Sequence, residues 1–260
     1  DIKKNLGTNA LIKISKTIVQ EPYLDIKIKK KYLGQKNWEK ILNGKLILDD
    51  IIRVRNDGSI EGKPFFNDGV WWVQSFSSTL PVRLISKVYN DQDKRKICIL
   101  DIGAAPGGKS FQLIEENFDV TSIDISERRM RRFKENLNRL KLKTKAVCKD
   151  VFEYKTKKFF DCILVDAPCT ASGLIQKKPE ILIRNKEINL EKLISKQKRL
   201  LDHAAKILKV GGYIVYCVCS INSKEGVNQI ESFLKNNLNF TTINLNQKIT
   251  NFGKILGKGM

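Results

Sequence analysis

Short apolar runs alternate with segments of helical periodicity from about residue 97 onward. Five of the runs have the length of a buried strand: ICILDIG, DVTSIDI, KAVCKD, FDCILVDAP and YIVYCVCS. The segments GGKSFQLIEEN, SERRMRRFKENLNRLKL and EKLISKQKRLLDHAAKILK space their apolar residues as an amphipathic helix does. This alternation of strands and helices predicts an α/β fold of Rossmann-like type, with a mostly parallel sheet and helices on both faces.

Each predicted strand ends at or near a residue that could take part in chemistry. In chain order these residues are Asp101, Asp124, Asp150, Asp166 and Cys219. Parallel sheets of this class bind their ligands outside the carboxyl ends of the strands. We therefore expect a ligand site at this edge of the sheet.

The chain before this region has a different pattern and predicts separate parts. Residues 1–20, with the run ALIKISKTIVQ, are predicted to form a linker helix, and residues 21–69 a small N-terminal α/β subdomain. The main domain is expected over residues 70–260. The chain starts at Asp1 without an initiator methionine and stops within NFGKILGKGM, where one more strand is due. We therefore expect a fragment whose main domain lacks its last strand.

Composition narrows the class of protein. The 260 residues are 42% hydrophobic, which is normal for a globular core. No apolar run reaches the roughly 18 residues that cross a bilayer, and no signal-peptide pattern opens the chain, so a cytoplasmic protein without a membrane contact is expected.

The net charge is strongly positive, at +20, with an isoelectric point near 9.7. The excess of basic residues is spread along the chain rather than confined to a tail. Such a balance favours a polyanion as partner, nucleic acid above all. The alternative is that many of the lysines are merely solvated and reflect biased codon usage.

The cysteines raise a separate question. A disulfide framework is not expected without secretion, and a zinc site is not expected from a chain with no CxxC pair and the single histidine His203. We expect neither a metal nor a stable oligomer. Two cysteines within apolar runs, Cys98 and Cys162, are expected in the core, and Cys217 is expected to pack within its strand, while the pattern around Cys148 decides nothing.

The stretch LDIGAAPGGKS, residues 100–110, joins the first strand of the predicted sheet to a helix. It is neither GxGxxG nor a phosphate-binding Walker loop, and Pro106 removes one backbone donor that a pyrophosphate would use. Together with Asp124 at the end of the next strand, it favours a nucleoside ligand without a polyphosphate, and S-adenosylmethionine fits that description. A glycine-rich turn alone would be weak evidence, because loops need glycine in any case.

Two further cysteines follow the fourth and fifth strands, in VDAPCTASGL and YCVCSINSKEG. Loops after neighbouring strands lie close together, so we expect Cys169 and Cys219 to face one pocket beside the nucleoside. A thiolate can add to C6 of a pyrimidine and make C5 nucleophilic enough to accept a methyl group. The alternative is that small cysteines merely fill tight turns.

Three stretches, LDIGAAPGGKS, DAPCTASGLIQKKPEI and YCVCSINSKEGVNQI, resemble the signature motifs of the RNA (cytosine-5) methyltransferases, most of all the bacterial Fmu/Sun type that modifies 16S ribosomal RNA. The resemblance implies the S-adenosylmethionine-dependent methyltransferase fold. It also implies that Asp124 holds the ribose, Asp150 lies near the adenine and Asp166 lies between cofactor and target base. The remaining cofactor-binding positions that it implies are Gly103, Ala104, Ala105, Pro106, Gly107, Gly108 and Lys109.

The same resemblance assigns the two cysteines different roles. Cys219, in the position of the family's TCS motif, would attack C6, and Cys169 would assist release of the methylated product. DNA cytosine methyltransferases use the cysteine of the PC motif instead. The chain departs from the family at Val218, where threonine is usual, at Ser75, where aspartate is usual, and at Gly103, where cysteine is common.

Ribosomal RNA is the partner that the resemblance implies, and a target cytosine must be unstacked to reach such a pocket. We expect RNA contacts from Lys177, Lys178 and Arg184 beside the catalytic cysteines and from the small N-terminal subdomain. The basic run SERRMRRFKENLNR could also offer Arg128, Arg129, Arg131 and Arg132 to phosphates, although a solvated helix face explains it equally well.

Alternatives remain open for the substrate and for catalysis itself. The substrate could be transfer RNA or DNA, or the chain could be a non-catalytic RNA-binding assembly factor with the same fold. The paired tryptophans Trp71 and Trp72 could stack on bases, but packing against the main domain is the expectation.

Overall fold

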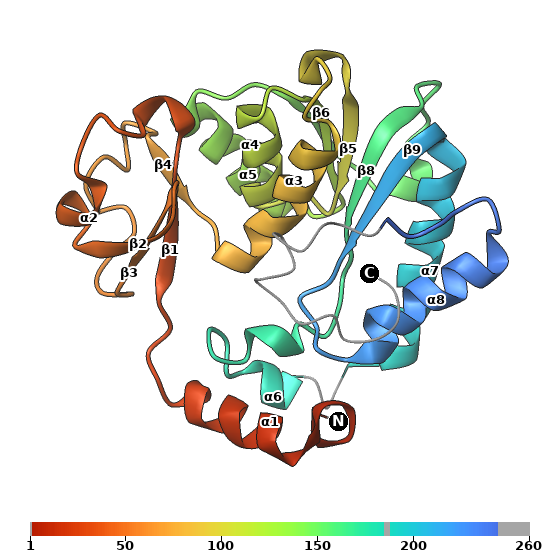
Figure 1. Cartoon of the computed structure of the whole chain (residues 1–260), viewed down its shortest axis with the longest axis horizontal. Helices are drawn as coiled ribbons and strands as arrows, with labels where there is room; N and C mark the ends of the chain where they lie inside the picture. Colours follow the sequence, from red (N-terminus) through yellow and green to blue (C-terminus); the bar gives the residue numbers. More distant parts are fainter. Residues whose placement is uncertain (1, 185–187, 244–260) are drawn as a thin grey trace. The chain divides into compact units, whose positions relative to one another are not determined.

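The computed structural model describes residues 2–184 and 188–243 and divides them into two compact units (Figure 1). The sheet unit consists of Glu21–Asp166 and Ile207–Val215. The cysteine unit consists of the described residues of 1–20, 167–206 and 216–260. Each unit is described by itself.

The main sheet of the sheet unit has five strands in the order β7-β6-β5-β8-β9. Their bounds are β5 Cys98–Ile102, β6 Asp119–Asp124, β7 Lys145–Cys148, β8 Phe160–Asp166 and β9 Leu208–Cys217, the last two residues of which belong to the cysteine unit. β5 runs parallel to both β6 and β8, and β6 runs parallel to β7. The predicted Rossmann-like, mostly parallel sheet is confirmed.

The strand order reverses between β5 and β8, because the chain first builds outward through β6 and β7 and then returns to the other side of β5. Ile102 pairs with Ile123 of β6 and with Val165 of β8. The next residue of each strand therefore lies at the same level at the carboxyl edge of the sheet. Such a switch point is where open α/β sheets bind their ligands.

Three helices of the sheet unit, α3 Phe76–Val88, α4 Gly108–Glu115 and α5 Glu127–Leu140, lie on one side of these strands (Figure 1). The buried side chains of α5 recur at helical spacing: Met130, Phe133, Leu137 and Leu140. They pack on Phe111 of α4, whose ring centroid lies 5.4 Å from that of Phe133. This apolar face holds α4, and with it the turn that precedes α4, against the sheet.

A second, four-stranded sheet precedes α3 and has the order β2-β3-β1-β4 with antiparallel pairing. Its elements are β1 Leu24–Ile28, the 3-10 turns of Lys30–Tyr32, α2 Trp38–Ile41, β2 Gly44–Leu48, β3 Ile51–Val54 and β4 Trp71–Val73. The chain therefore forms a small α/β part here. Its sheet extends to Val73, past the boundary expected at residue 69, because β4 pairs with β1.

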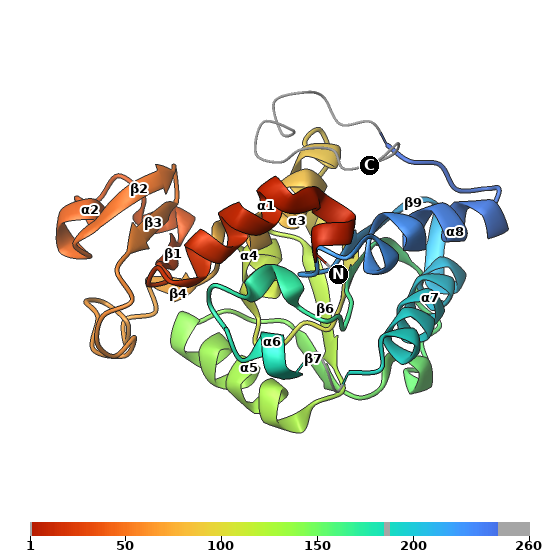
Figure 2. The same cartoon turned by 90° about the horizontal axis from the view of Figure 1, so that it is seen from below.

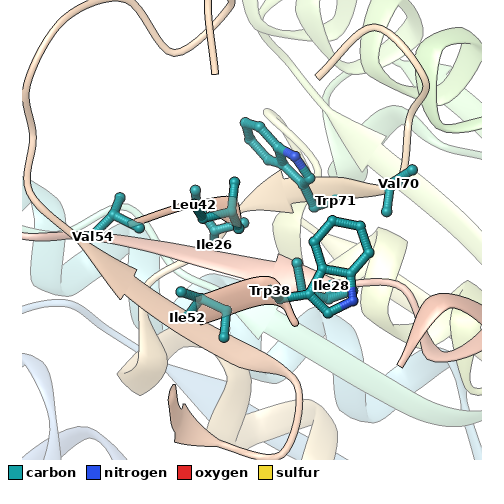
Figure 3. Close-up of a cluster of buried hydrophobic side chains, with 8 residues drawn as sticks. All are labelled: Ile26, Ile28, Trp38, Leu42, Ile52, Val54, Val70 and Trp71. Atoms are coloured by element: carbon teal, nitrogen blue, oxygen red, sulfur yellow. The ribbon is translucent and has the colours of Figure 1, made fainter. Parts of the chain in front are cut away.

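Two tryptophans close the core of the small sheet (Figure 3). Trp71 is fully buried and Trp38 nearly so, and each indole N–H finds a backbone acceptor, Pro64 O at 2.8 Å and Tyr32 O at 2.9 Å. Trp72 on the same strand is 2% exposed and points into the core of the main sheet, against Phe111. The expectation that the paired tryptophans pack against the main domain is confirmed for Trp72, whereas Trp71 packs in the core of the small sheet.

Buried charged groups fasten the small sheet to the helices beside it. Lys27 of β1 bonds Asp50, whose other oxygen accepts from Arg83 of α3. Lys29 donates to the backbone oxygen of Leu140 at the end of α5. Arg139 donates to the backbone oxygens of Phe66, at 2.8 Å, and Trp71, at 3.0 Å. A buried charge without a partner would be costly, so each of these side chains has to meet its partner when the chain folds. The contacts therefore define how the small sheet meets α3 and α5.

The cysteine unit contains α1 Ile2–Ile18, α6 Ile181–Arg184, α7 Leu190–Ile207 and α8 Val227–Asn236, with short 3-10 turns at Ser172–Leu174 and Ser223–Glu225. Helix α1 spans most of the predicted 1–20 helix and breaks at Gly7, whose φ is 82°. α7 and α8 lie side by side (Figures 1 and 2), joined by the bond from Gln229 Nε2 to Ile194 O, 3.0 Å. In the part of the chain that the structure describes, no helix is both long and apolar enough to cross a membrane.

Replacing Trp71 by alanine should lower the free energy of unfolding by about 3–5 kcal/mol, because it removes the largest side chain of the small core and leaves a cavity. Val73→Ala on the same strand is the matched control. That side chain is 39% exposed, so its truncation should change stability by no more than about 0.5 kcal/mol. Chemical denaturation followed by tryptophan fluorescence and circular dichroism measures both. Equal losses would show that the small sheet does not depend on this core.

Candidate active site

The turn from β5 to α4 is built on two glycines that no other residue could replace. Gly103 has a φ of 77°, and a Cβ there would lie 2.5 Å from the backbone oxygen of Asp166. Gly107 has a φ of 122°, and a Cβ would lie 2.0 Å from the ring of Phe111. Because both positions combine left-handed backbone with close contact, the chain can turn tightly here and leave backbone exposed for a ligand. Ala104 and Ala105 between them are buried in the core under α4 and α5.

Two glutamines, Gln74 and Gln112, support this turn. The sequence pattern did not indicate this role for them. Gln74 Nε2 donates to Gln112 Oε1 at 2.9 Å, and Trp72 Nε1 donates to Gln74 Oε1 at 2.8 Å. A Cβ on Gly108, the first residue of α4, would lie 3.3 Å from the Gln74 side chain. Gln74 thus sets the position at which α4 begins.

Ser75 replaces the aspartate of the family motif, and the structure shows what takes its place. Ser75 precedes α3 but makes no side-chain cap. The backbone N–H of Phe76 instead donates to Asp25 Oδ2 at 2.8 Å, from β1 of the small sheet. Asp25 is also paired with Arg53 at 2.7 Å, so the carboxylate is fixed in place. A carboxylate therefore meets the first turn of α3 although it comes from another strand.

Asp101, on β5, is fully buried. Its Oδ2 accepts from Ser110 Oγ at 2.6 Å, and Ser110 in turn accepts from Ser122 Oγ at 2.9 Å. Its Oδ1 has no hydrogen-bond partner among the described residues. Burial raises the pKa of Asp101 to about 7, against the hydrogen bond from Ser110, which lowers it. Asp101 is thus a buried carboxyl with one oxygen that has no partner among the described residues.

Asp124 ends β6 and is almost fully buried. Its Oδ1 accepts from the backbone N–H of Ser126 at 2.9 Å and from Arg129 at 2.8 Å, and its Oδ2 accepts from the N–H of Ala105 at 3.3 Å. The carboxylate is therefore tied to the glycine-rich turn, as its predicted role in the same site requires. The four arginines of α5 that the sequence offered to phosphates are all exposed, and one of them, Arg129, is paired with this carboxylate.

Asp166 and Lys109 form an ion pair of 2.6 Å at the switch point between β5 and β8. About a third of the Asp166 side chain is exposed, while Lys109 is largely covered. Asp150 follows β7 and accepts from the backbone N–H of Phe152 at 3.1 Å, which caps a short 3-10 turn. The sheet unit thus brings the predicted cofactor residues to one edge, on the ends of four strands.

Cys169 and Cys219 meet in the cysteine unit, with their sulfur atoms 3.2 Å apart and no disulfide between them. Cys219 is exposed and Cys169 is half-buried. The contact with Cys219, together with burial, raises the pKa of Cys169 well above its ordinary value. Of the two thiols, Cys219 is therefore the one that is more open to a substrate.

The other four cysteines have different surroundings. Cys162 is buried in β8 as expected, and Cys217 ends β9, where its backbone oxygen accepts from Ala167 N at 2.9 Å. Cys98, expected in the core, is only half-buried, and its thiol contacts Asp119 at 3.3 Å because it starts β5 at the sheet's opposite edge. Cys148 is exposed. Over residues 2–184 and 188–243, no group of three or more His, Cys, Asp or Glu side chains could hold a metal ion.

The predicted RNA-binding residues lie in the cysteine unit. Lys177 and Lys178 are exposed on the turn after Leu174, whose backbone oxygen accepts from both of their N–H groups at 2.9 Å. The side chain of Arg184 lies outside the described part of the structure.

Comparison with known proteins agrees with this geometry. The family model described as 16S rRNA methyltransferase RsmB/F matches residues 87–256. Ribosomal RNA small subunit methyltransferase B of Shewanella oneidensis is 35% identical over 191 residues, which is 72% of this chain and 43% of that protein. The chain therefore spans less than half the length of this relative.

Two solved structures share the fold. The protein PH0851 is 25% identical, with a TM-score of 0.79 over 90% of this chain and 55% of its own. NSun6 from Pyrococcus horikoshii, determined with SFG, is 19% identical, with a TM-score of 0.74 over 90% of this chain and 85% of its own.

The raised pKa of Asp101 has a consequence for stability. Between its ordinary value of 3.8 and about 7 the folded protein keeps this proton and the unfolded chain releases it. The free energy of unfolding should therefore fall as the pH rises through this window, and Asp101→Asn should reduce that fall. Denaturant unfolding at several pH values measures it, with the exposed Asp68→Asn as control. An Asp101→Asn variant with the wild-type slope would show that this carboxyl is ionised in the folded protein.

Proposed function

Because the chain belongs to the family described as 16S rRNA methyltransferase RsmB/F, we propose that it methylates C5 of a cytosine in RNA, with S-adenosylmethionine as the methyl donor. Small-subunit ribosomal RNA is the proposed substrate, as the names of the relatives suggest. The observation that carries this proposal is the contact between Cys169 and Cys219 at 3.2 Å, one thiol exposed and the other half-buried.

The residues at the edge of the main sheet fit S-adenosylmethionine. The turn through Gly103 and Gly107 lies close against Asp166 and Phe111, which fixes its backbone at the carboxyl edge of the sheet. Asp124, whose carboxylate accepts from the N–H of Ala105 in this turn, is the proposed partner of the ribose hydroxyls. Lys109 and Asp166 offer one charge of each sign to the charged amino-acid end. When bound, the cofactor would supply an electrophilic methyl group.

The cysteines supply the nucleophile that cytosine needs, because C5 of the free base is too electron-poor to take a methyl group. The Cys219 thiolate would form a bond from Sγ to C6 with its own electron pair, which raises the electron density at C5. After C5 has gained the methyl group, a base removes the C5 proton. The electrons of that C–H bond restore the C5–C6 double bond, and the bond from C6 to Sγ breaks to regenerate the Cys219 thiolate.

Exposure and pKa assign these roles to the two thiols. Cys219 is the exposed member and can reach a base that has left its stack. Cys169 is half-buried, and the contact with Cys219 together with burial raises its pKa; it would act in the release of the product. The assignment follows the resemblance to RNA rather than DNA cytosine methyltransferases.

Charge supports RNA as the substrate. The chain carries a net charge of +20, and phosphate contacts dominate affinity for nucleic acids. Lys177 and Lys178 are exposed in the cysteine unit and are the proposed contacts beside the target base. The small sheet of residues 24–73 is proposed as a further RNA-binding part.

Gly103→Ala should weaken binding of S-adenosylmethionine. Alanine at this position would have to adopt a left-handed backbone, and its Cβ would lie 2.5 Å from Asp166 O, so the turn would be displaced. The strain in the turn would be about 1–3 kcal/mol, which corresponds to a loss of affinity of roughly 10- to 100-fold. Titration calorimetry measures the affinity without RNA. Gly62→Ala is the control, because a Cβ there meets nothing closer than 3.6 Å. A folded Gly103→Ala protein with wild-type affinity would remove this turn from the cofactor site.

Replacing each thiol by serine should separate the roles of the two cysteines. With S-adenosylmethionine and RNA present, Cys169→Ser should accumulate a covalent protein–RNA adduct, because formation of the bond to C6 is intact and release is not. Cys219→Ser should form no adduct, because the nucleophile is absent. Denaturing gel electrophoresis with labelled RNA detects the adduct.

Cys148→Ser serves as the control for this pair of variants, since Cys148 is exposed and belongs to the sheet unit, away in sequence from both cysteine loops. It should methylate RNA at the wild-type rate and accumulate no adduct. The reverse pattern, with an adduct in Cys219→Ser and none in Cys169→Ser, would sink the assignment. Competition by duplex DNA but not by RNA would overturn the substrate class.

A further inference from the structure

A fully buried carboxylate, Glu225, lies beneath the two cysteine loops of the cysteine unit. It sits in a short 3-10 turn five positions after Ser220, within the stretch YCVCSINSKEGVNQI. Buried carboxylates are rare unless they are paired or fully hydrogen-bonded. Glu225 has no ion-pair partner within the described residues, so its neighbours must be hydrogen-bond donors.

Four such donors converge on Glu225. Its Oε1 accepts from Thr170 N at 2.9 Å and from Gln197 Nε2 at 3.1 Å. Its Oε2 accepts from the hydroxyls of Thr170 and Ser220. Thr170 directly follows Cys169 and Ser220 directly follows Cys219, so one carboxylate holds the neighbours of both thiols.

The surrounding bonds leave these donors little freedom. Gln197 also donates to Pro168 O at 2.9 Å, so Cys169 is held on both sides. Gln229 donates to Gln197 Oε1 at 3.2 Å, and this acceptor contact turns the Gln197 amide nitrogen toward Glu225. The N–H of Gly173 donates to the backbone oxygen of Cys219 at 2.9 Å, which joins the two loops directly.

From these contacts we infer that Glu225 is a positioning residue, whose hydrogen bonds to the neighbours of Cys169 and Cys219 hold the two thiols in contact. Glu225 touches neither sulfur, so it acts through the two loops. A misplacement of an ångström at a reacting group can cost a large factor in rate. The positioning of the two thiols by Glu225 does not depend on the proposed function. Only the use of these thiols in methyl transfer rests on it.

The contact of the thiols can be measured without RNA or cofactor, so its failure is distinct from failure of the proposed function. Diamide oxidises neighbouring thiols: it takes up two electrons and two protons, and a bond forms between the two sulfur atoms. The rate at which Cys169 and Cys219 become linked, followed by mass spectrometry of peptides, reports how often they meet. Melting curves confirm that each variant is folded at the temperature used.

Glu225→Ala should slow this linkage by at least about tenfold, because the loops lose their common anchor. Glu225→Gln should stay close to the wild-type rate. Its amide oxygen can still accept from Thr170 N and Gln197, and its NH2 group can donate to the two hydroxyls, which also accept. Glu231→Ala on the exposed side of α8 should have no effect. A fold-stabilising role alone would leave the rate unchanged in protein that remains folded.

Two outcomes would overturn the inference. One is a folded Glu225→Ala protein that forms the linkage at the wild-type rate. The other is a Glu225→Gln protein that is slowed as much as Glu225→Ala, since the charge rather than the hydrogen bonds would then matter.

If Glu225→Ala does not fold, Ser220→Ala decides the question. It removes the donor next to Cys219 and leaves the other three on Glu225, so the linkage should slow by roughly threefold. Ser232→Ala, exposed on α8, is the matched control and should react at the wild-type rate. A Ser220→Ala protein indistinguishable from Ser232→Ala would also overturn the inference.

Discussion

The close approach of two backbone segments at Gly103 is the constraint on which the main sheet's ligand edge depends. A side chain there would lie 2.5 Å from the backbone oxygen of Asp166, so the turn after β5 can lie against the end of β8 only without one. Parallel pairing of β5 with β6 and β8 then brings the ends of three strands level. Asp124 reaches back to the turn through Ala105 N, and Lys109 from α4 reaches Asp166. A single missing Cβ therefore positions both carboxylates.

Two fully buried carboxylates of this chain illustrate different uses of burial. Asp101 receives one side-chain hydrogen bond and keeps a free oxygen, and burial raises its pKa to about 7. Glu225 receives four hydrogen bonds from two loops and a helix. A buried acid with few hydrogen bonds holds its proton to a higher pH, while a fully bonded one suits a structural anchor. The chain thus contains both kinds, one in each unit.

Much of the site could be predicted because its residues stand in local patterns. The glycine-rich turn, Asp124, Asp166, Cys169 and Cys219 each stand at or after the end of a recognisable strand; the structure confirms the strands and shows the two thiols 3.2 Å apart. The supporting residues could not be found this way. Gln74 bonds Gln112, 38 residues further along the chain, and Glu225 bonds Thr170, 55 residues before it; no short-range pattern indicates such partners. Cys98 was expected in the core because it stands in an apolar run. In the structure it is the first residue of β5 and is only half-buried.

The sequence by itself determined the order of strands and helices, the tight turn after β5 and the residues that carry the proposed chemistry. These depend on periodicity and on backbone freedom over a few neighbouring positions. The tertiary structure alone decided which partner each polar group has. Asp25 of β1 accepts from the backbone N–H of Phe76 at the start of α3, and Arg129 pairs with Asp124. Hydrogen bonds and ion pairs join atoms that meet only after the chain has folded, so their partners are a property of the packing rather than of the local sequence.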